Sequence, residues 1–269
     1  MSMESSSAAD RVSRSGVLRA SPPIFETRAL DRLTRVHPAV PALIFLPAVA
    51  LLLALAVDAQ SVSAVLVEVA AGYLFWTLVE YWGHRAVFHF EPERGVGVRL
   101  HWMIHGVHHD HPNDPRRLVL PPVLSLPLAV GFYGLFVAVL GTPLGWGACA
   151  GFFAGYLLYD MVHFGLHHRR PRSRFGRWLR ELHMRHHFED DERGFGVSVP
   201  WWDIVFGTYS RRVAPHPLRP WVRTPQLMRG KALAGGVTFP RTGATGESPS
   251  DVTVVTAEPC RGARPIARR

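Results

Sequence analysis

Histidine is the residue type whose number and spacing indicate chemistry in this sequence of 269 residues. Ten of its fifteen histidines fall into four short clusters. Positions i, i+3 and i+4 share one face of an α-helix, so a His-x-x-His-His triplet can direct three imidazoles at one point, and an i, i+4 pair can direct two. The clusters are His84 with His89, His105 with His108 and His109, His163 with His167, and His183 with His186 and His187.

The first cluster does not have a regular helical spacing. An α-helix would place His84 and His89 about 140° apart, so we expect a helix end or a distorted turn between them. Three more histidines, His101, His111 and His168, adjoin the clusters. We expect His101 to support the site or to lie at its edge, and His168 to point elsewhere on its helix.

Ten histidines with these spacings predict a site for two metal ions. Imidazole is a good ligand for iron, zinc, copper and nickel. A closed tetrahedral zinc site uses four ligands, whereas ten nitrogens give each of two metals five ligands and a sixth position for water or O2. That arrangement favours iron, which zinc can replace during isolation. Nearby carboxylates that could accept hydrogen bonds from the ring N–H groups are Glu80, Asp160, Glu181, Glu189 and Asp190.

The hydropathy pattern predicts an all-α integral membrane protein with four transmembrane helices. No charged residue occurs between Leu118 and Tyr159, a run long enough for about two bilayer crossings. An uncharged run earlier in the chain and the mostly apolar run after it are each long enough for one more. We therefore expect spans at about 39–57, 62–80, 118–140 and 144–162.

Basic residues predict the orientation of these spans. The two short turns, 58–61 and 141–143, contain no Arg or Lys, whereas residues 1–36 contain six Arg and residues 84–117 contain five. Basic residues collect on the cytoplasmic side of short loops, so we expect both termini and a helical, histidine-rich cap in the cytoplasm, in a multi-pass protein of a bacterial cytoplasmic membrane. The same bias explains the net charge of +9 without nucleic acid binding.

Other segments of the chain predict less chemistry. Residues 1–36 have the composition of a flexible leader, and residues 213–269 that of a disordered Arg- and Pro-rich tail, which leaves 37–212 as the membrane domain. Residues 174–188 form one amphipathic helix that we expect to lie on the membrane with its histidines turned inward. Two cysteines and no glycine-rich phosphate loop exclude an iron–sulfur cluster, a disulfide framework and a nucleotide site.

These motifs resemble those of the fatty acid hydroxylase superfamily, whose members are membrane non-haem dimetal oxygenases and include sterol desaturases and carotenoid hydroxylases. The resemblance extends from about Glu80 to Tyr209 and is greatest to the fatty acid 2-hydroxylases. It is carried by the histidine spacings and by His105-Gly-Val-His-His109, Arg117-Leu-Val-Leu-Pro-Pro122, Tyr159-Asp-Met-Val-His-Phe-Gly-Leu-His-His168 and Gly194-Phe-Gly-Val-Ser-Val-Pro-Trp-Trp-Asp-Ile-Val-Phe-Gly-Thr-Tyr209.

The resemblance implies a four-helix membrane anchor whose cytoplasmic cap holds two metals near the bilayer surface. It implies hydroxylation of a lipid acyl chain by O2, expected at carbon 2, with the second oxygen atom leaving as water. No amino-acid acid or base can attack an unactivated C–H bond, which fits a metal-dependent reaction. The positions that match the family's metal ligands are His84, His89, His105, His108, His109, His163, His167, His183, His186 and His187.

The sequence departs from the family in its electron supply. Many members carry an N-terminal b-type cytochrome domain with a His-Pro-Gly-Gly haem motif, but here His37-Pro38 is followed by Ala-Val. We therefore expect an external electron donor, either a ferredoxin or a b-type cytochrome with its reductase. Whether the substrate is a ceramide, another acyl lipid or a free fatty acid stays open.

Two alternative functions stay open at this point. One is a sterol- or carotenoid-modifying oxygenase of the same superfamily. The other is a non-catalytic membrane protein that uses its histidines to bind or move zinc. Transport usually places ionisable residues within the spans, and only Glu68 lies well within one, which favours an enzyme.

Overall fold

A computed structural model of the chain describes residues 14–90, 92 and 94–211. Every regular element among these residues is a helix, which confirms the all-α prediction. Residues 1–13 and the predicted disordered tail, 213–269, lie outside the described part of the chain.

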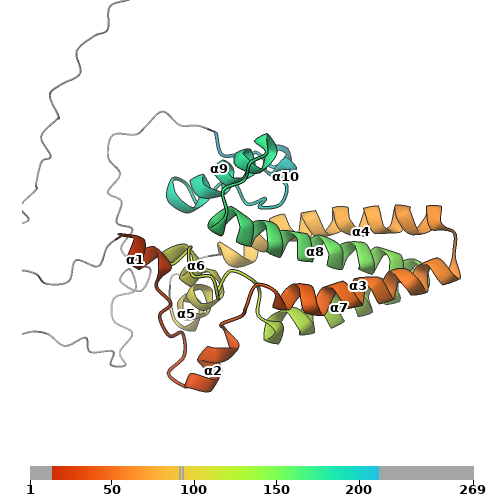
Figure 1. The fold of residues 1–269 in the computed structure, drawn as a ribbon, viewed down its shortest axis with the longest axis horizontal. Coiled ribbons are helices and arrows are strands. Elements are labelled where there is room, and N and C mark those ends of the chain that lie inside the picture. The colour runs from red at the N-terminus through yellow and green to blue at the C-terminus, as the bar shows by residue number, and fades with distance from the viewer. Residues whose placement is uncertain (1–13, 91, 93, 212–269) are drawn as a thin grey trace, which may run out of the picture. The chain divides into compact units, whose positions relative to one another are not determined.

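Four long helices run side by side as a bundle (Figure 1). They are α3 (Val40–Ala59), α4 (Val62–Trp82), α7 (Pro122–Leu140) and α8 (Leu144–His168). Three candidate membrane spans are long and apolar enough to cross a membrane: α3, the stretch Val62–Phe88 that begins with α4, and α7. The fourth predicted crossing corresponds to α8. Length and composition do not confirm it as a span, because α8 is less apolar than the other three long helices.

Helix α8 is central because it packs against α3, α4 and α7. Its glycines allow the backbone of α4 to approach closely. A Cβ atom on Gly151 would lie 2.0 Å from the carbonyl oxygen of Val69, and one on Gly72 would lie 1.9 Å from that of Ala148. Small residues in both helices therefore set the distance between them, as is common where helices pack within membranes.

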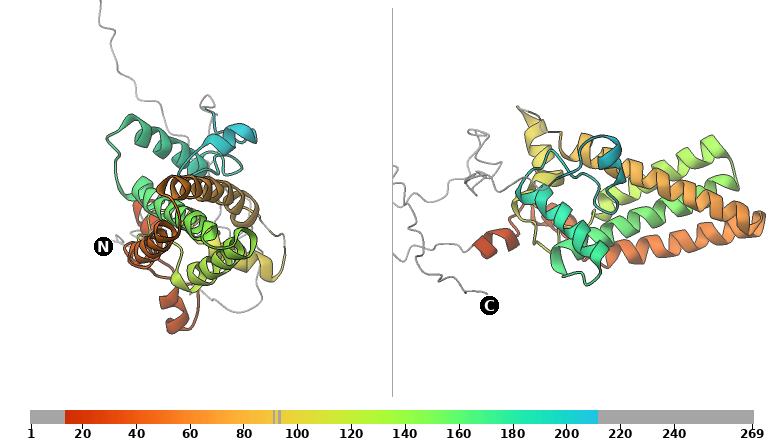
Figure 2. Two further views of the ribbon diagram at one scale, coloured as in Figure 1. Left: turned by 90° about the vertical axis from the view of Figure 1, so that its right-hand side faces the viewer. Right: turned by 90° about the horizontal axis from the view of Figure 1, so that it is seen from above.

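The short helices gather at one end of the bundle (Figures 1 and 2). They are the π-helices η1 (Gly83–Phe88) and η2 (Trp102–Gly106), together with α5 (Val96–His101), α6 (Val107–Asp110), α9 (Arg174–Phe188) and α10 (Trp201–Val205). All four histidine clusters lie on these helices or at the adjoining end of α8.

Helix α9 spans the residues predicted for it, and part of its apolar face is buried within the protein. The hydroxyl oxygen of Ser173 accepts a hydrogen bond from the Gly176 N–H and begins the helix. Leu179 is buried in a small core cluster with Leu166 of α8 and Val197. Leu182 is buried as well, whereas Phe175 at the start of the helix is exposed, and the position of α9 on the membrane stays a prediction.

Residues 14–36, expected to be flexible, include two short helices, α1 (Arg14–Arg19) and α2 (Arg28–Leu33). Asp31 in α2 is buried and forms ion pairs with Arg35 and with Arg117, which lies far along the chain. Composition does not reveal such contacts, because they join segments that are distant in sequence.

Candidate metal centre

Ten histidines form two groups of five at the end of the bundle. Each residue contributes one ring nitrogen, and the nitrogens of a group all lie within 4.8 Å of one another. We call the groups the first and the second pentad. The first pentad is His84, His89, His105, His109 and His186, and the second is His108, His163, His167, His183 and His187. The structure thus brings together all ten histidines that the sequence predicts as ligands.

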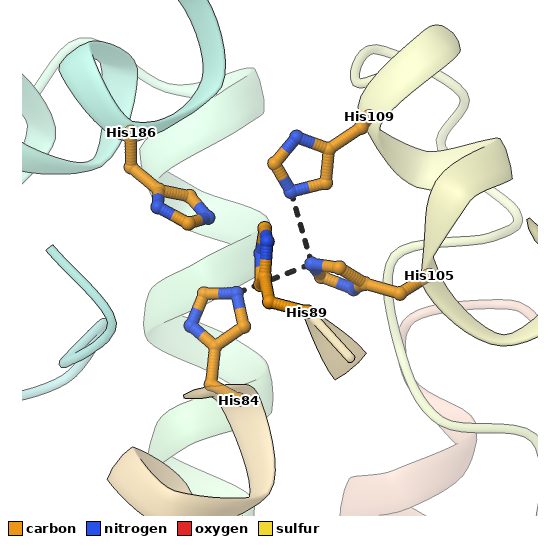
Figure 3. Close-up of side chains that lie close together, drawn as sticks. All are labelled: His84, His89, His105, His109 and His186. Carbon is orange, nitrogen blue, oxygen red and sulfur yellow. Dashed lines mark hydrogen bonds between the residues drawn. The ribbon is translucent and has the colours of Figure 1, made fainter. Parts of the chain in front are cut away.

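A π-helical turn brings His84 and His89 together, and Figure 3 shows both rings within the first pentad. The His89 N–H donates to the carbonyl oxygen of His84 at 3.0 Å, five residues earlier. A turn closed by an i to i+5 hydrogen bond returns residue i+5 to the side of residue i, and π-turns are frequent at functional sites. The centroids of the two rings are 4.9 Å apart. The predicted distorted turn is confirmed.

The two triplets are each divided between the pentads. His105 and His109 belong to the first pentad, whereas His108, from the same triplet, belongs to the second. The triplet of α9 divides the opposite way, with His186 in the first pentad and its two neighbours in the second. The expectation that each triplet points at one metal is therefore wrong. Around a helix, residue i+4 lies about 40° to one side of residue i, and residue i+3 lies about 60° to the other side. The first and last histidines of a triplet therefore face one pentad, and the middle histidine faces the other.

The pentads are adjacent to each other. The ring of His109 in the first pentad and that of His187 in the second have centroids 4.3 Å apart. His108 and His109, consecutive residues of α6, have centroids 5.9 Å apart and lie in different pentads. Two metals held by the pentads would therefore be neighbours.

Hydrogen bonding alone does not satisfy the crowded nitrogens of the second pentad. His108 Nε2 lies 3.1 Å from the Nε2 atoms of both His163 and His187, and His183 Nε2 lies 2.8 Å and 3.2 Å from those of His167 and His187. A neutral imidazole nitrogen either donates or accepts, so it cannot do one to each of two neighbours. A cation among them can take all five lone pairs, so the donor set fits a metal ion.

The histidines of the cap are held in the neutral form that a metal requires. Burial, and then the neighbouring histidine rings, lower the pKa of five of them well below the ordinary value. Metal ions bind the deprotonated ring nitrogen, so these residues are prepared for coordination at neutral pH. The five are His105, His108, His109, His183 and His187.

Two histidines of the first pentad are oriented by the backbone of the loop 193–198. The Nδ1–H of His84 donates to the carbonyl oxygen of Phe195 at 2.6 Å, and the Nδ1–H of His186 donates to that of Arg193 at 2.8 Å. A carbonyl oxygen can only accept, so the proton lies on Nδ1 and the lone pair of Nε2 faces the centre of the pentad. For these two rings, backbone carbonyl groups accept the N–H hydrogen bonds that we expected carboxylates to accept.

Two buried carboxylates hold this loop in place. Glu80 of α4 accepts from the N–H groups of Val197 at 2.8 Å and Ser198 at 2.7 Å, and from the Ser198 hydroxyl. Asp203 of α10 accepts from the Phe195 N–H at 2.9 Å. Glu80 was expected to accept a hydrogen bond from a histidine ring. It instead holds the loop whose carbonyl groups accept those hydrogen bonds.

The other predicted carboxylates have different environments. Glu181 pairs with Arg185, Asp190 lies 3.5 Å from Arg193, Glu189 is exposed, and Asp160 is buried within α8. The role of Asp203 and the loop carbonyls was missed from the sequence. The pair Gly194 and Gly196 was the available signal: Gly194 has a φ of 76°, and a Cβ on Gly196 would lie 2.2 Å from the Val199 carbonyl oxygen.

The histidines beside the clusters lie outside the pentads. His101 Nε2 donates to the carbonyl oxygen of Phe88 at 2.5 Å and so supports the end of η1, as expected. His111 Nδ1 donates to the carbonyl oxygen of Val17 at 2.6 Å. His168 is exposed, and its ring lies 4.5 Å from that of Phe164, centroid to centroid.

A bundle of membrane-type helices with two five-histidine groups at one end defines the class: a helical membrane protein with two groups of residues that could each hold a metal ion. The sequence pattern of the fatty acid hydroxylase family matches residues 69–208, and the chain belongs to that family.

Known relatives cover the same region. The chain is 45% identical over 150 residues to the ceramide very long chain fatty acid hydroxylase SCS7 of Saccharomyces cerevisiae, covering 54% of this chain and 38% of the relative. It is 37% identical over 190 residues to the dihydroceramide fatty acyl 2-hydroxylase FAH2 of Arabidopsis thaliana, covering 70% of this chain and 79% of the relative. For the related FAH1 of the same plant, 62% of the relative is covered.

The fold is also similar to a solved structure, described as full-length scs7p with only the hydroxylase domain visible. The TM-score is 0.65 at 36% sequence identity, over 71% of this chain and 73% of the other.

Proposed function

We propose that this protein is a membrane dimetal monooxygenase that hydroxylates a lipid acyl chain at carbon 2, with the ten pentad histidines as metal ligands. The observation that carries the proposal is the pair of adjacent five-histidine groups. It is supported by membership of the fatty acid hydroxylase family and by relatives named as ceramide and dihydroceramide fatty acyl hydroxylases. The metal we expect in the active protein is iron.

The chain's own residues have definable tasks in this reaction. Two iron ions bound in the pentads would supply the activation of O2 that an unactivated C–H bond requires. Each group of five histidines would hold one metal ion through one ring nitrogen per residue. The loop 193–198 fixes the rings of His84 and His186, and Glu80 and Asp203 keep that loop in place.

We further propose that α8 is a fourth crossing and that the pentads face the cytoplasm. Twenty-five residues of helix extend about 37 Å, more than the roughly 30 Å of a bilayer's hydrocarbon core. Apolar side chains beside the cap are exposed, among them Val96 at 84% and Phe90 at 66%. Such residues suit contact with lipid, and an insoluble acyl chain could reach the site from the bilayer.

Among the described residues, the two pentads are the groups of His, Cys, Asp or Glu that could hold a metal ion, and we infer that the electrons come from a separate partner. We propose a ferredoxin or a b-type cytochrome, with its reductase, as the donor. Purified protein given O2 and NAD(P)H alone should then be inactive, and adding either donor system should restore turnover.

Mass spectrometry of lipids tests the proposal. Iron-loaded protein in vesicles, supplied with a donor system, O2 and a fatty acid or ceramide, should add one oxygen atom at carbon 2. Oxidation of a sterol or carotenoid instead would place the protein in another branch of the superfamily. Zinc movement into the vesicles without any oxygenation would select the non-catalytic alternative.

A further inference from the structure

The residues that precede the first long helix lie against the loop that follows the second histidine cluster. We call residues 14–36 the strap; it contacts the loop 111–117 between α6 and α7. Three of the hydrogen bonds that join them run from His111 Nδ1 to the Val17 carbonyl oxygen (2.6 Å), from the Asn113 N–H to that of Leu18 (2.9 Å), and from the Val36 N–H to that of Arg116 (2.8 Å).

A buried ion pair lies among these contacts. One carboxylate oxygen of Asp31 accepts from Arg117 Nη2 at 3.0 Å and from the Ile24 N–H at 2.7 Å, and the other accepts from Arg35 Nε at 2.8 Å. The side chain of Arg117 is only 3% exposed and also donates to the carbonyl oxygen of Pro22. Removing one partner of a buried pair leaves the other charge uncompensated, which is strongly destabilising.

The electrostatics of Asp31 agree with this geometry. Burial works to raise the pKa of Asp31, but the hydrogen bonds from Arg35 and Ile24 and the positive charges of Arg35 and Arg117 outweigh it and lower that pKa. The carboxylate is thus charged at neutral pH, as the ion pair requires.

The loop that the strap holds follows directly after three ligands. Only Asp110 separates His109 from His111, where the strap is attached. Helix α6 is the last four residues of a continuous helical run, 96–110, that begins with α5 and η2 and ends where the loop 111–117 begins. The run holds α6 from its N-terminal side, so the C-terminal end, next to His108 and His109, is the end that the loop 111–117 and its contacts with the strap can position.

We propose that Asp31 and Arg117 are positioning residues of the metal centre, whose buried ion pair clamps the strap onto the loop 111–117 and so fixes where His108 and His109 present their rings. The family match begins at residue 69, so the strap lies outside it. The inference rests on the proposed function in one respect, that the pentads hold metal.

Cobalt(II) tests the clamp without any need for turnover, because its visible absorption reports its ligands. Asp31→Asn keeps the size of the side chain and removes the charge, and Arg117→Lys keeps the charge and removes the forked donor. The matched control is Glu26→Gln, the same acid-to-amide change at an exposed position of the strap. Each variant of the full chain is loaded with Co²⁺, and its spectrum and its rate of metal loss to a chelator are measured with its unfolding temperature.

We expect Asp31→Asn to lose cobalt about 10-fold faster than the parent, the scale of losing support behind a ligand, with shifted absorption bands. Arg117→Lys should change in the same direction, and Glu26→Gln should match the parent. If Asp31→Asn does not fold, Arg117→Lys decides by the same two readouts. Variants that lower only the unfolding temperature, with parental spectrum and metal loss, would show a merely structural contact and overturn the clamp. A parent that takes up no cobalt would instead overturn the metal centre, and the clamp with it.

Discussion

Two histidines of the first pentad have ring nitrogens with separate roles. For His84 and His186, Nδ1 donates to a loop carbonyl and Nε2 faces the pentad. The carbonyl fixes which nitrogen carries the proton, and therefore which one has a lone pair for a metal. The histidine supplies the ring nitrogen, and the carbonyl group beside the ring determines that Nε2 keeps a lone pair for a metal ion.

Removing one ligand should empty or weaken one pentad. His108→Ala takes a nitrogen from the second pentad, so we expect metal content to fall from about two per chain toward one, and hydroxylation to drop at least 10- to 100-fold. His168→Ala, at an exposed histidine outside both pentads, is the control and should leave both unchanged. Elemental analysis and product assays on the same samples check this. Full metal content and full activity in His108→Ala would contradict the ligand assignment.

The metal-free protein should lose stability on mild acidification. The buried histidines of the cap have pKa values well below that of an unfolded chain, near 6.5, so below that pH the unfolded state binds more protons than the folded state. The free energy of unfolding must then fall as the pH drops from 7 toward 5, by as much as about 1.4 kcal/mol per pH unit for each such histidine. Bound metal should move this loss to lower pH.

Thermal unfolding of metal-free and metal-loaded protein between pH 7 and 5 measures the difference. A metal-free protein whose unfolding temperature stays constant over this range would show that the histidines are not buried as neutral groups.

Among the elements, helix geometry decides how the ligands are distributed. The π-turn of η1 places His84 beside His89. The middle histidine of each triplet, His108 or His186, lies in the other pentad from its two companions. The ligands come from η1 and its C-cap, η2, α6, α8 and α9. Their convergence therefore requires a fixed distance between α4, which leads into η1, and α8.

A larger side chain between α4 and α8 should disturb both stability and metal binding. Gly151→Val would place its Cβ 2.0 Å from the Val69 carbonyl oxygen, so the two helices must move apart. We expect a loss of at least the roughly 1–3 kcal/mol typical of overpacking, with reduced metal retention. Gly131→Val in α7, where a Cβ meets nothing within 4 Å, is the matched control. Equal unfolding free energies and metal contents for the two variants would contradict this account of the interface.

In the whole molecule, apolar helices lie next to a histidine-rich end, an arrangement that suits the proposed reaction on a water-insoluble substrate. The outer surfaces of α3 and α7 expose aliphatic side chains, such as Leu43 at 73% and Val130 at 71%. Charged residues gather instead at the end that carries the pentads and in the flanking segments. This division indicates one orientation in a membrane.

Topology reporters can test that orientation. A reporter fused after Tyr209 should be cytoplasmic, and one inserted at Ala59, in a turn region without Arg or Lys, should be external. Selective labelling of intact cells distinguishes the two sides. Finding both reporters on one side would rule out four crossings with a cytoplasmic cap.

The sequence by itself determined the features that depend on local pattern. The positions of the apolar helices, the amphipathic helix Arg174–Phe188, the irregular turn at His84 and the full set of histidines in the pentads follow from hydropathy, periodicity and residue spacing. Each of these is encoded within a few turns of chain, where side-chain chemistry and helix geometry act directly.

Only the tertiary structure decided which histidine belongs to which pentad, which groups orient the rings and what residues 14–36 do. His84 and the carbonyl group of Phe195 are 111 residues apart, and Asp31 and Arg117 are 86 apart. Every residue has a carbonyl group, and an aspartate occurs in flexible segments as well as in buried ion pairs, so neither group indicates its partner. Spacing along the chain carries no information about such partners, because they meet only when helix packing brings distant segments within hydrogen-bonding distance.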